Sequence, residues 1–420
     1  MKKHIDIGII GGGSIFSPEM IDILAQYTDD IGEMTVRLMD TDSERLKTVG
    51  AFCERIVTKL KKPVNIVYTD TYEDTIKDTD FVLIQFRVGG EEARISDDRI
   101  GMKYKIPFVE TVSVCGLASF LRTYYQMEII ADLTQKYAPK SWIMNFANPS
   151  GALTEALYRL GCSNVMGVCN APCGSIGSYA DRLGTKPESV FMNWRGLNHL
   201  SVVDGVFYNG ENVYERLLDE FEGDQIGPYT KDFVIKVGYT PNGYLQYIYN
   251  KEQVVEKLQA QETTRAEDVL KVNKEILSLY STIDSLPEKL KERGGFGYSR
   301  GVADIIKGLS TNIPSVHYPS IRNGSTIPEL HEDAFIEVPA LISKNGVRAV
   351  QVEPLPETVK SIVITMKQYE RALFEAARKR DKNLLFKAML INPLFGSQCL
   401  TTPILDEVLT ANAAFLPTFN

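Results

Sequence analysis

The chain has 420 residues, of which 44% are hydrophobic and 24% are charged, the composition of an ordinary globular protein. A chain this long buries a sizeable core without disulfide bonds and is expected to form two or three domains. The net charge of −8 and the pI near 5.3 argue against a nucleic-acid-binding or anionic-membrane surface, because either needs clustered lysines and arginines. The net charge does not exclude a small anionic substrate, since a few local arginines suffice to bind one.

The six cysteines form no CxxC pair and no regular framework, which indicates a reduced, cytoplasmic protein. The first residues lack the pattern of a signal peptide. No apolar run approaches the ~20 residues that a membrane span needs. We therefore expect a cytoplasmic protein that binds neither nucleic acid nor a membrane.

Strand and helix patterns alternate through the first half of the chain. Strands are expected at 5–10, 35–39, 64–68, 81–84, 141–145 and 164–168, with helices at 18–27, 43–60, 115–136 and 150–160. This alternation predicts a doubly wound parallel sheet with helices on both faces, and so an α/β fold.

After about residue 185 the pattern changes. Segments 189–194 and 199–208 are β-like and separated by a short turn, which predicts antiparallel pairing. Helices are expected at 251–283, 298–308, 356–380, 382–391 and 402–414. We predict two domains: residues 1–190, and an α+β domain of residues 191–420 with antiparallel strands and several long helices.

A glycine-rich turn follows the first strand. Gly11-Gly12-Gly13-Ser14 lies between a strand and a helix, and Asp40 ends the second strand. Backbone N–H groups of such a turn can bind a pyrophosphate, and an acidic residue at that place binds ribose hydroxyls, which favours NAD over NADP. Phe16 replaces the third glycine of the full fingerprint, and a plain structural turn is the alternative. The context favours a Rossmann-like NAD-binding domain.

Polar residues follow three further strands or loops of this domain. Arg87 and Arg94 come after the fourth strand, at the end where open α/β sheets bind ligands, and either could grip a phosphate or carboxylate. Glu110 precedes the long helix, where it could act only as a helix-start charge. Asn148 ends the fifth strand and is either the N-cap of the next helix, with Pro149 at its first position, or a ligand for sugar hydroxyls.

Cys169 and His199 are a candidate metal pair. A lone cysteine and a lone histidine 30 residues apart are more often core residues. With open positions left for substrate oxygens and water, the pair suits manganese or another divalent transition metal acting as a Lewis acid.

Two tyrosines in the segment 244–249 are candidate bases, provided that a nearby cation lowers the pKa of the phenol. The residues alone do not distinguish Tyr244 from Tyr247, and core packing is the alternative for both.

In order along nearly the whole chain, these segments resemble glycoside hydrolase family 4, the NAD- and metal-dependent glycosidases. The shared segments are Gly11–Ser14, Arg87–Gly90, Asn145–Gly151, Gly167–Pro172, Gly196–Leu200, Tyr244-Leu245, Arg265, Arg293–Gly295 and Asn323–Ser325.

The resemblance implies a role for each matching residue. Cys169 and His199 would hold the metal, usually manganese(II), and Tyr244 would be the general base assisted by Glu110. Arg94, Asn148 and Arg265 would bind substrate. Arg87 belongs to the implied cofactor site, together with Gly11, Gly12, Gly13, Ser14 and Asp40. A homodimer or homotetramer is also implied.

The implied reaction departs from the two-carboxylate scheme of most glycosidases. NAD takes a hydride from carbon 3 of the sugar, the metal polarises the resulting ketone, and Tyr244 removes the proton on carbon 2. The aglycone then leaves from carbon 1, water adds, and the stored hydride reduces the ketone.

Two positions bear on the subtype. Asn170 stands where family members acting on α-glycosides often carry Asp or His, and it resembles the 6-phospho-β-glucosidase branch. Residues 110–116 read Glu-Thr-Val-Ser-Val-Cys-Gly where the family usually has Glu-Thr-Thr-Gly-x-Gly-Gly, so the lost glycines would reshape the pocket.

Two other functions compete. A lactate/malate-type dehydrogenase shares the N-terminal fold, but the chain has no Gly-x-x-Gly-His-like segment. A non-catalytic NAD or sugar-phosphate sensor is favoured by the altered segment and opposed by the retained Cys169, His199 and Tyr244. A family relative with a different glycoside substrate is the nearest alternative.

Overall fold

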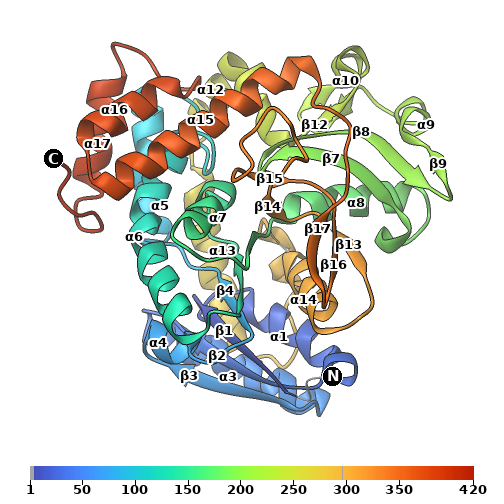
Figure 1. The fold of residues 1–420 in the computed structure, drawn as a ribbon. Helices are drawn as coiled ribbons and strands as arrows, with labels where there is room; N and C mark the ends of the chain where they lie inside the picture. Colours follow the sequence, from blue (N-terminus) through green and yellow to red (C-terminus); the bar gives the residue numbers. More distant parts are fainter. Residues whose placement is uncertain (1–3, 296) are drawn as a thin grey trace.

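Parallel strands form one part of a twelve-stranded sheet in the computed structural model, which describes residues 4–295 and 297–420 (Figure 1). Their order across the sheet is β3, β2, β1, β4, β5, β6, and each neighbouring pair is parallel. The bounds are β1 (His4–Ile10), β2 (Glu33–Met39), β3 (Val64–Thr69), β4 (Phe81–Ile84), β5 (Trp142–Asn145) and β6 (Val165–Gly167). The predicted doubly wound sheet is confirmed.

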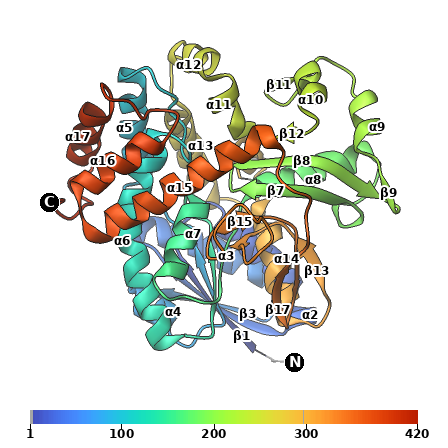
Figure 2. The same ribbon diagram turned by 45° about the horizontal axis from the view of Figure 1, so that its top comes forward.

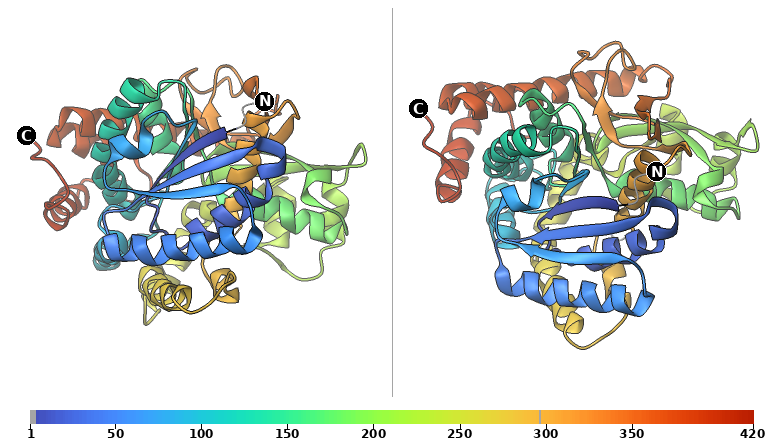
Figure 3. Two further views of the ribbon diagram at one scale, coloured as in Figure 1. Left: turned by 90° about the horizontal axis from the view of Figure 1, so that it is seen from below. Right: turned by 60° about the horizontal axis from the view of Figure 1, so that its bottom comes forward.

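Helices from both halves of the chain cover this part of the sheet. Helices α1 and α3 pack together with α13 and α14, whereas α4, α6 and α7 form a second group; Figure 3 shows α3 running beside β1 to β3. The bounds are α1 (Ser17–Gln26), α3 (Ser43–Leu60), α4 (Tyr72–Ile76), α6 (Val114–Tyr137), α7 (Ser150–Arg159), α13 (Arg265–Tyr280) and α14 (Tyr298–Ser310). The predicted helix over 43–60 is present as α3, and its apolar side chains Leu46, Val49, Phe52 and Ile56 are buried.

The same sheet continues into the second half of the chain through antiparallel strands. Beyond β6 the order is β14, β15, β7, β8 and β12, and the twelfth strand, β9 (Glu211–Asn212), pairs with β8. The predicted antiparallel strands are confirmed. The bounds are β7 (Phe191–Leu197), β8 (Leu200–Tyr208), β12 (Thr240–Pro241), β14 (Ser320–Arg322) and β15 (Phe335–Glu337). The boundary at residue 190 stays a prediction, since one sheet joins both parts.

Smaller elements complete the second half. Strands β13 (Ser315–His317), β16 (Ala340–Ser343) and β17 (Gly346–Ala349) form a three-stranded sheet. Helix α15 (Glu357–Lys379) crosses the molecule and packs on α16 (Lys382–Ile391), which contacts α17 (Thr401–Ala411) (Figure 2). The predicted C-terminal helices are present.

The prediction of a single helix over residues 251–283 is wrong. The structure has two, α12 (Lys251–Gln259) and α13, separated by residues 260–264. Thr264 starts α13 with a capping box: its hydroxyl accepts from the Glu267 N–H, and the Glu267 carboxylate accepts from the Thr264 N–H at 2.8 Å. Such a cap stabilises a new helix start.

Besides several short helices, two longer ones were not predicted, α5 (Gly90–Lys103) and α8 (Asn170–Arg182). Helix α5 buries acidic side chains, among them Asp97 and Asp98, so it lacks the apolar stripe that reveals most helices. Helix α8 buries only Pro172 and Ala180. The N-cap alternative for Asn148 is also wrong, because Pro149 is the N-cap of α7 and its helix begins at Ser150.

A buried ion pair joins α5, α6 and the segment after α17. Arg122 is 1% exposed and binds Asp97 through two hydrogen bonds of 2.9 and 2.7 Å. Its Nε donates to the Val88 carbonyl at 3.2 Å, and its Nη1 donates to Asn412 Oδ1. One guanidinium therefore connects three segments that are distant in sequence.

We predict that Arg122→Met destabilises the protein by about 3–5 kcal/mol, because it leaves the Asp97 carboxylate buried without a partner. Urea denaturation followed by circular dichroism measures the loss. The matched control is Lys47→Met, which breaks an ion pair whose side chains are 70% and 83% exposed and should leave stability nearly unchanged, because solvent screens such a pair. Equal effects in the two variants would contradict the prediction.

Candidate active site

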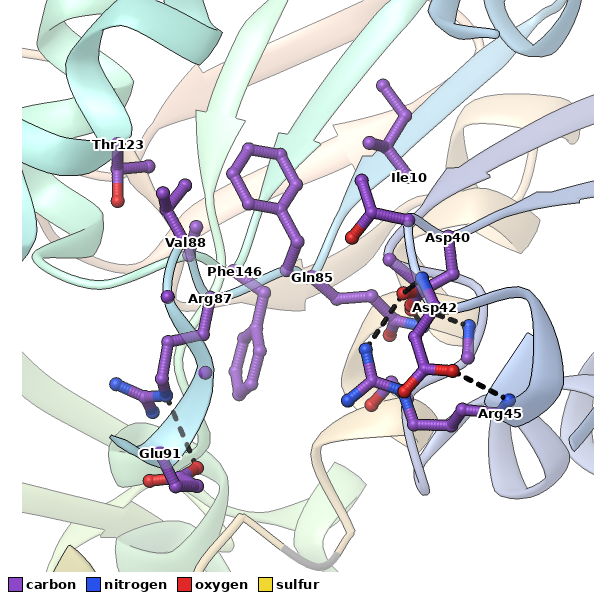
Figure 4. Close-up of a pocket in the computed structure, with 18 of the residues that line it drawn as sticks. Ile10, Asp40, Asp42, Arg45, Gln85, Arg87, Val88, Glu91, Thr123 and Phe146 are labelled. Carbon is purple, nitrogen blue, oxygen red and sulfur yellow. Dashed lines mark hydrogen bonds and ion pairs between the residues drawn. The ribbon is translucent and has the colours of Figure 1, made fainter. Parts of the chain in front are cut away.

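A large cavity lies at the carboxyl ends of the parallel strands. Its volume is about 660 Å³, within the range of small-molecule and cofactor sites. Figure 4 shows Asp40, Asp42 and Arg45 on one side and Arg87 with Glu91 on the other, with Phe146 between them. The cavity is also lined by Gly11, Gly13, Ser14, Asn148, Asn273, Arg293, Tyr298 and Phe415. Both halves of the chain thus build it.

The glycine turn follows β1 and lines the cavity. Gly11 has φ +90°, and a Cβ there would lie 2.8 Å from the Phe86 nitrogen, so only glycine allows β1 and β4 to approach this closely. Asp40 accepts from the Gly13 N–H at 3.0 Å and from Arg45 at 2.8 Å. Its carboxylate closes the turn and still faces the cavity, as a ribose-binding acid would.

Charged side chains fill the side of the cavity after β4. Arg87 donates to Glu110 and forms an ion pair of 3.3 Å with Glu91. Arg94 lies 3.6 Å from Glu110 and 3.4 Å from Glu91, and Arg293 lies 3.5 Å from Glu91. Three guanidinium groups face two carboxylates, which leaves one net positive charge in this cluster.

Glu110 is fully ionised. Burial opposes its ionisation, but the positive charges of Arg87 and Arg94 outweigh burial and hold its pKa well below the ordinary value. The prediction that Glu110 could be only a helix-start charge is not supported by the geometry, since α6 begins at Val114 and the carboxylate lies in the arginine cluster.

Cys169 and His199 meet in space although their strands are separate. Cys169 is the N-cap of α8, directly after β6, and His199 lies in the two-residue turn between β7 and β8 with φ +66°. Their Sγ and Nε2 atoms are 3.3 Å apart, and both residues are buried. Within the described part of the chain, no group of three or more His, Cys, Asp or Glu could hold a metal ion.

The pair fits one metal ion with further positions left for other ligands. Bonds of about 2.3 Å to sulfur and about 2.0 Å to nitrogen place adjacent ligand atoms roughly 3 to 3.6 Å apart, and the observed distance lies in this range. His199 is neutral, since burial lowers its pKa to about 4, and a neutral imidazole is the form that binds metals. The donor set of one thiolate and one imidazole suits a divalent transition metal.

Buried acidic groups surround the pair. Burial raises the pKa of Cys169 to about 12, and the Glu337 carboxylate adds to the rise. Glu337 is 1% exposed and accepts from Trp194 and Asn198, each at 2.9 Å. Burial raises its pKa to about 7, and no salt bridge among the described residues reaches it.

Tyr244 stacks directly on the histidine of the pair. The ring centroids of Tyr244 and His199 are 3.8 Å apart with an interplanar angle of 16°, whereas Tyr247 lies 5.8 Å from Tyr244. Burial, and then the charge of Glu110, raise the pKa of Tyr244 above its ordinary value. A nearby cation would bring this pKa down.

The remaining predicted residues lie around this centre. Asn148 lines the cavity, and its carbonyl accepts from Ser119 at 2.9 Å. Arg265 is exposed at the start of α13, beside Gly294. The altered segment is core: Val112 and Cys115 are 3% and 1% exposed, and neither lines the cavity.

Several cavity residues received no role from the sequence. Phe146 stacks on Tyr298 at 3.8 Å, and the Tyr298 hydroxyl donates to Gln85. Gln85 also donates to the Gly11 carbonyl at 3.2 Å. Phe146 stands inside the Asn145–Gly151 segment shared with the family. The sequence did not indicate that the others line a cavity, because aromatic residues are common in cores.

Comparison with known proteins identifies the family. The model of family 4 glycosyl hydrolases matches residues 6–184, and the model of the family 4 C-terminal domain matches residues 194–395. The chain belongs to the family 4 glycosyl hydrolases. The resemblance seen in the sequence is therefore confirmed.

Individual relatives agree over the whole length. A protein of Bacillus subtilis described as a probable 6-phospho-beta-glucosidase is 34% identical and covers 100% of this chain and 99% of its own. The solved structure of the Thermotoga maritima 6-phospho-beta glucosidase with manganese, NAD+ and glucose-6-phosphate is 32% identical, has a TM-score of 0.93 and covers 99% and 100% of the two chains.

A lactate dehydrogenase of Eimeria maxima is also similar, with 14% identity, a TM-score of 0.57 and coverage of 90% of this chain and 96% of its own. This likeness shows the shared fold alone. In the described residues, no helix is both long and apolar enough to cross a membrane.

We predict that Mn²⁺ affinity rises about tenfold per pH unit between pH 6 and 8, because binding expels one proton from the Cys169 thiol. The thiol, with a pKa of about 12, is protonated throughout this window. His199, with a pKa of about 4, has already lost its proton and adds nothing to the slope. Calorimetry in buffers of different ionisation enthalpy measures the released proton.

The control is Cys169→Ser, which should lose both the affinity and its pH dependence. A Mn²⁺ affinity in the unchanged protein that does not vary with pH would contradict a thiolate ligand.

Proposed function

We propose that this protein hydrolyses 6-phospho-β-glucosides in a reaction that requires NAD and a divalent metal ion, manganese(II) in the first instance. The observation that carries the proposal is the stacking of Tyr244 on His199, with Cys169 3.3 Å away. A candidate base and two candidate metal ligands thus share one buried site. The full-length relatives described as 6-phospho-β-glucosidases point to the substrate class.

The cofactor cavity and the metal pair are connected through Glu110. Arg87 lines the cavity and binds Glu110. The Glu110 charge in turn influences the pKa of both His199 and Tyr244. A sugar placed between the cavity and the pair would therefore lie within reach of both.

Bound NAD would supply a hydride acceptor and donor, and a bound metal ion would polarise a sugar carbonyl and so acidify the neighbouring C–H bond. Cys169 and His199 would hold the ion and leave positions open for two sugar oxygens. Tyr244, as the phenolate, removes the proton on carbon 2. Positive charge at the pair is needed for this role, because burial otherwise keeps the phenol protonated.

Arginines support an anionic substrate. The cluster of Arg87, Arg94 and Arg293 carries one net positive charge after pairing with Glu91 and Glu110. Arg94 and Arg265 are our candidates for sugar-phosphate binding, with Asn148 for a hydroxyl. Arginine binds phosphate oxygens through two parallel N–H groups.

Asn170 supports the β-linked subtype. It is the first residue of α8, next to Cys169, and its amide has no acidic proton to give to a leaving group. Water would then protonate the aglycone, which suits activated or aryl leaving groups. We further propose a cytoplasmic location, where 6-phosphosugars are available, and a homodimer or homotetramer.

The test is a panel of p-nitrophenyl glycosides, phosphorylated or free and α or β, each with and without NAD, Mn²⁺ and reductant. We expect cleavage of the 6-phospho-β-glucoside only when NAD and Mn²⁺ are both present. Cleavage without NAD, or no cleavage of that substrate under any condition, would overturn the proposal.

We predict that Tyr244→Phe lowers kcat by about 10²–10⁴-fold, the usual contribution of a general base. Exchange of the carbon 2 proton with D₂O, followed by NMR, should be lost in step with kcat, while NAD and Mn²⁺ affinities stay unchanged. The matched control is Tyr247→Phe, which removes a neighbouring hydroxyl and should retain exchange. Retained exchange in the Tyr244 variant would assign the base elsewhere.

A further inference from the structure

The segment after α17, residues 412–420, is fixed at both ends; we call it the tail. Asn412 is 2% exposed, its amide donates to the Val408 carbonyl at 2.8 Å, and its Oδ1 accepts from Arg122. At the other end the Asn420 N–H donates to the Arg380 carbonyl at 2.8 Å. The tail therefore follows a defined path.

Phe415 differs from the other large apolar residues of the tail. Leu416 and Phe419 pack against the hydrophobic core. Phe415 is 39% exposed and lines the cavity at the ends of the parallel strands. Its ring contributes little to the core and faces the space where the cofactor is proposed to bind.

The ring rests on the turn that begins α5. Gly89 has φ +80°, and the Phe415 Cζ atom lies 3.1 Å from the place that a Cβ of Gly89 would occupy. The missing side chain lets the ring approach the backbone between Arg87 and Glu91, two residues that line the same cavity.

One guanidinium positions both the ring and the turn. Arg122 donates to the Val88 carbonyl at 3.2 Å and also binds Asn412, and the Phe415 N–H donates to the Asn412 carbonyl at 2.9 Å. Figures 1 and 2 both show α17 beside α5, and Glu407 of α17 accepts from the Tyr104 hydroxyl at 2.9 Å. The ring is thus held at the cavity wall by buried contacts.

We propose that Phe415 is a cofactor-binding residue whose ring forms an apolar wall against which the bound dinucleotide packs. A partly exposed aromatic ring gains free energy when a flat base or nicotinamide ring covers it, by removal of apolar surface from water and by ring–ring contact. The inference rests on the proposed NAD-dependent function and adds to it a contribution from outside the nucleotide-binding half.

The experiment measures NAD⁺ and NADH affinities by calorimetry and NADH fluorescence. Phe415→Ala should weaken both about five- to twentyfold, as removal of an aromatic ring from a stacked base does. Phe415→Tyr keeps the ring and should stay within about twofold. In turnover assays, Phe415→Ala should raise the KM for NAD and leave kcat at saturating NAD unchanged.

Phe207→Ala is the matched control, since Phe207 is also 39% exposed but lies on β8 and does not line the cavity. It should bind NAD as the unchanged protein does. The Phe415 ring does not contact the Cys169–His199 pair, so the Mn²⁺ affinity of each variant shows whether it has folded. If Phe415→Ala fails this check, Phe415→Leu replaces it.

Unaltered NAD affinity in folded Phe415→Ala or Phe415→Leu would overturn the proposal. Absence of NAD binding by the unchanged protein would instead refute the proposed function, so the two failures are distinguishable.

Discussion

The site depends on the burial of acidic groups around Cys169 and His199, where their negative charge would be uncompensated. Cys169 and Glu337 are buried and Tyr244 is partly buried, and desolvation raises the pKa of each. In a protein interior an unpaired anion costs several kcal/mol, so all three favour their protonated forms. A divalent cation at the pair would lower the pKa of both the Cys169 thiol and the Tyr244 phenol, because a nearby opposite charge stabilises the ionised form.

The sheet explains how residues so distant in sequence reach this one place. Strand β14 pairs Ser320 with Gly167, and β15 pairs Glu337 with Gly196. The end of β6, the turn after β7 and the end of β15 therefore lie side by side at the edge where the parallel strands also end. The cavity and the Cys169–His199 pair share this edge, so a continuous sheet fixes their separation.

Much of this arrangement could be predicted from the sequence, for physical reasons that differ between regions. The buried strands and α3 were predicted because their apolar patterns follow the periods of strand and helix. Helix α5 was missed because it buries carboxylates that pair with arginines from elsewhere, such as Asp97 with Arg122. Its burial depends on tertiary partners that no local pattern reveals.

The candidate site shows the same division. The glycine turn and Asp40 have a local signature, whereas Cys169 and His199 gained weight only from the order of the family's segments. The residues alone did not distinguish Tyr244 from Tyr247. The family resemblance favoured Tyr244, and the structure stacks that ring on His199. Residues such as Tyr298 and Phe415 reach the cavity by packing from the second half of the chain, and their role could not be predicted without the fold.

Fold likeness alone does not decide what such a site does. The fold is similar to that of a lactate dehydrogenase at a TM-score of 0.57 over 90% of this chain, and the Cys169–His199 pair lies where the parallel strands continue into β14, β15, β7 and β8. A dehydrogenase needs a hydride acceptor and one acid–base group. In the proposed function, a metal ion held by that pair, with the partly buried Tyr244 beside it, would also acidify a C–H bond next to the oxidised carbon. On the function proposed above, His199 in the turn between β7 and β8 and Tyr244 after β12 would add this chemistry to a cavity built at the ends of the parallel strands.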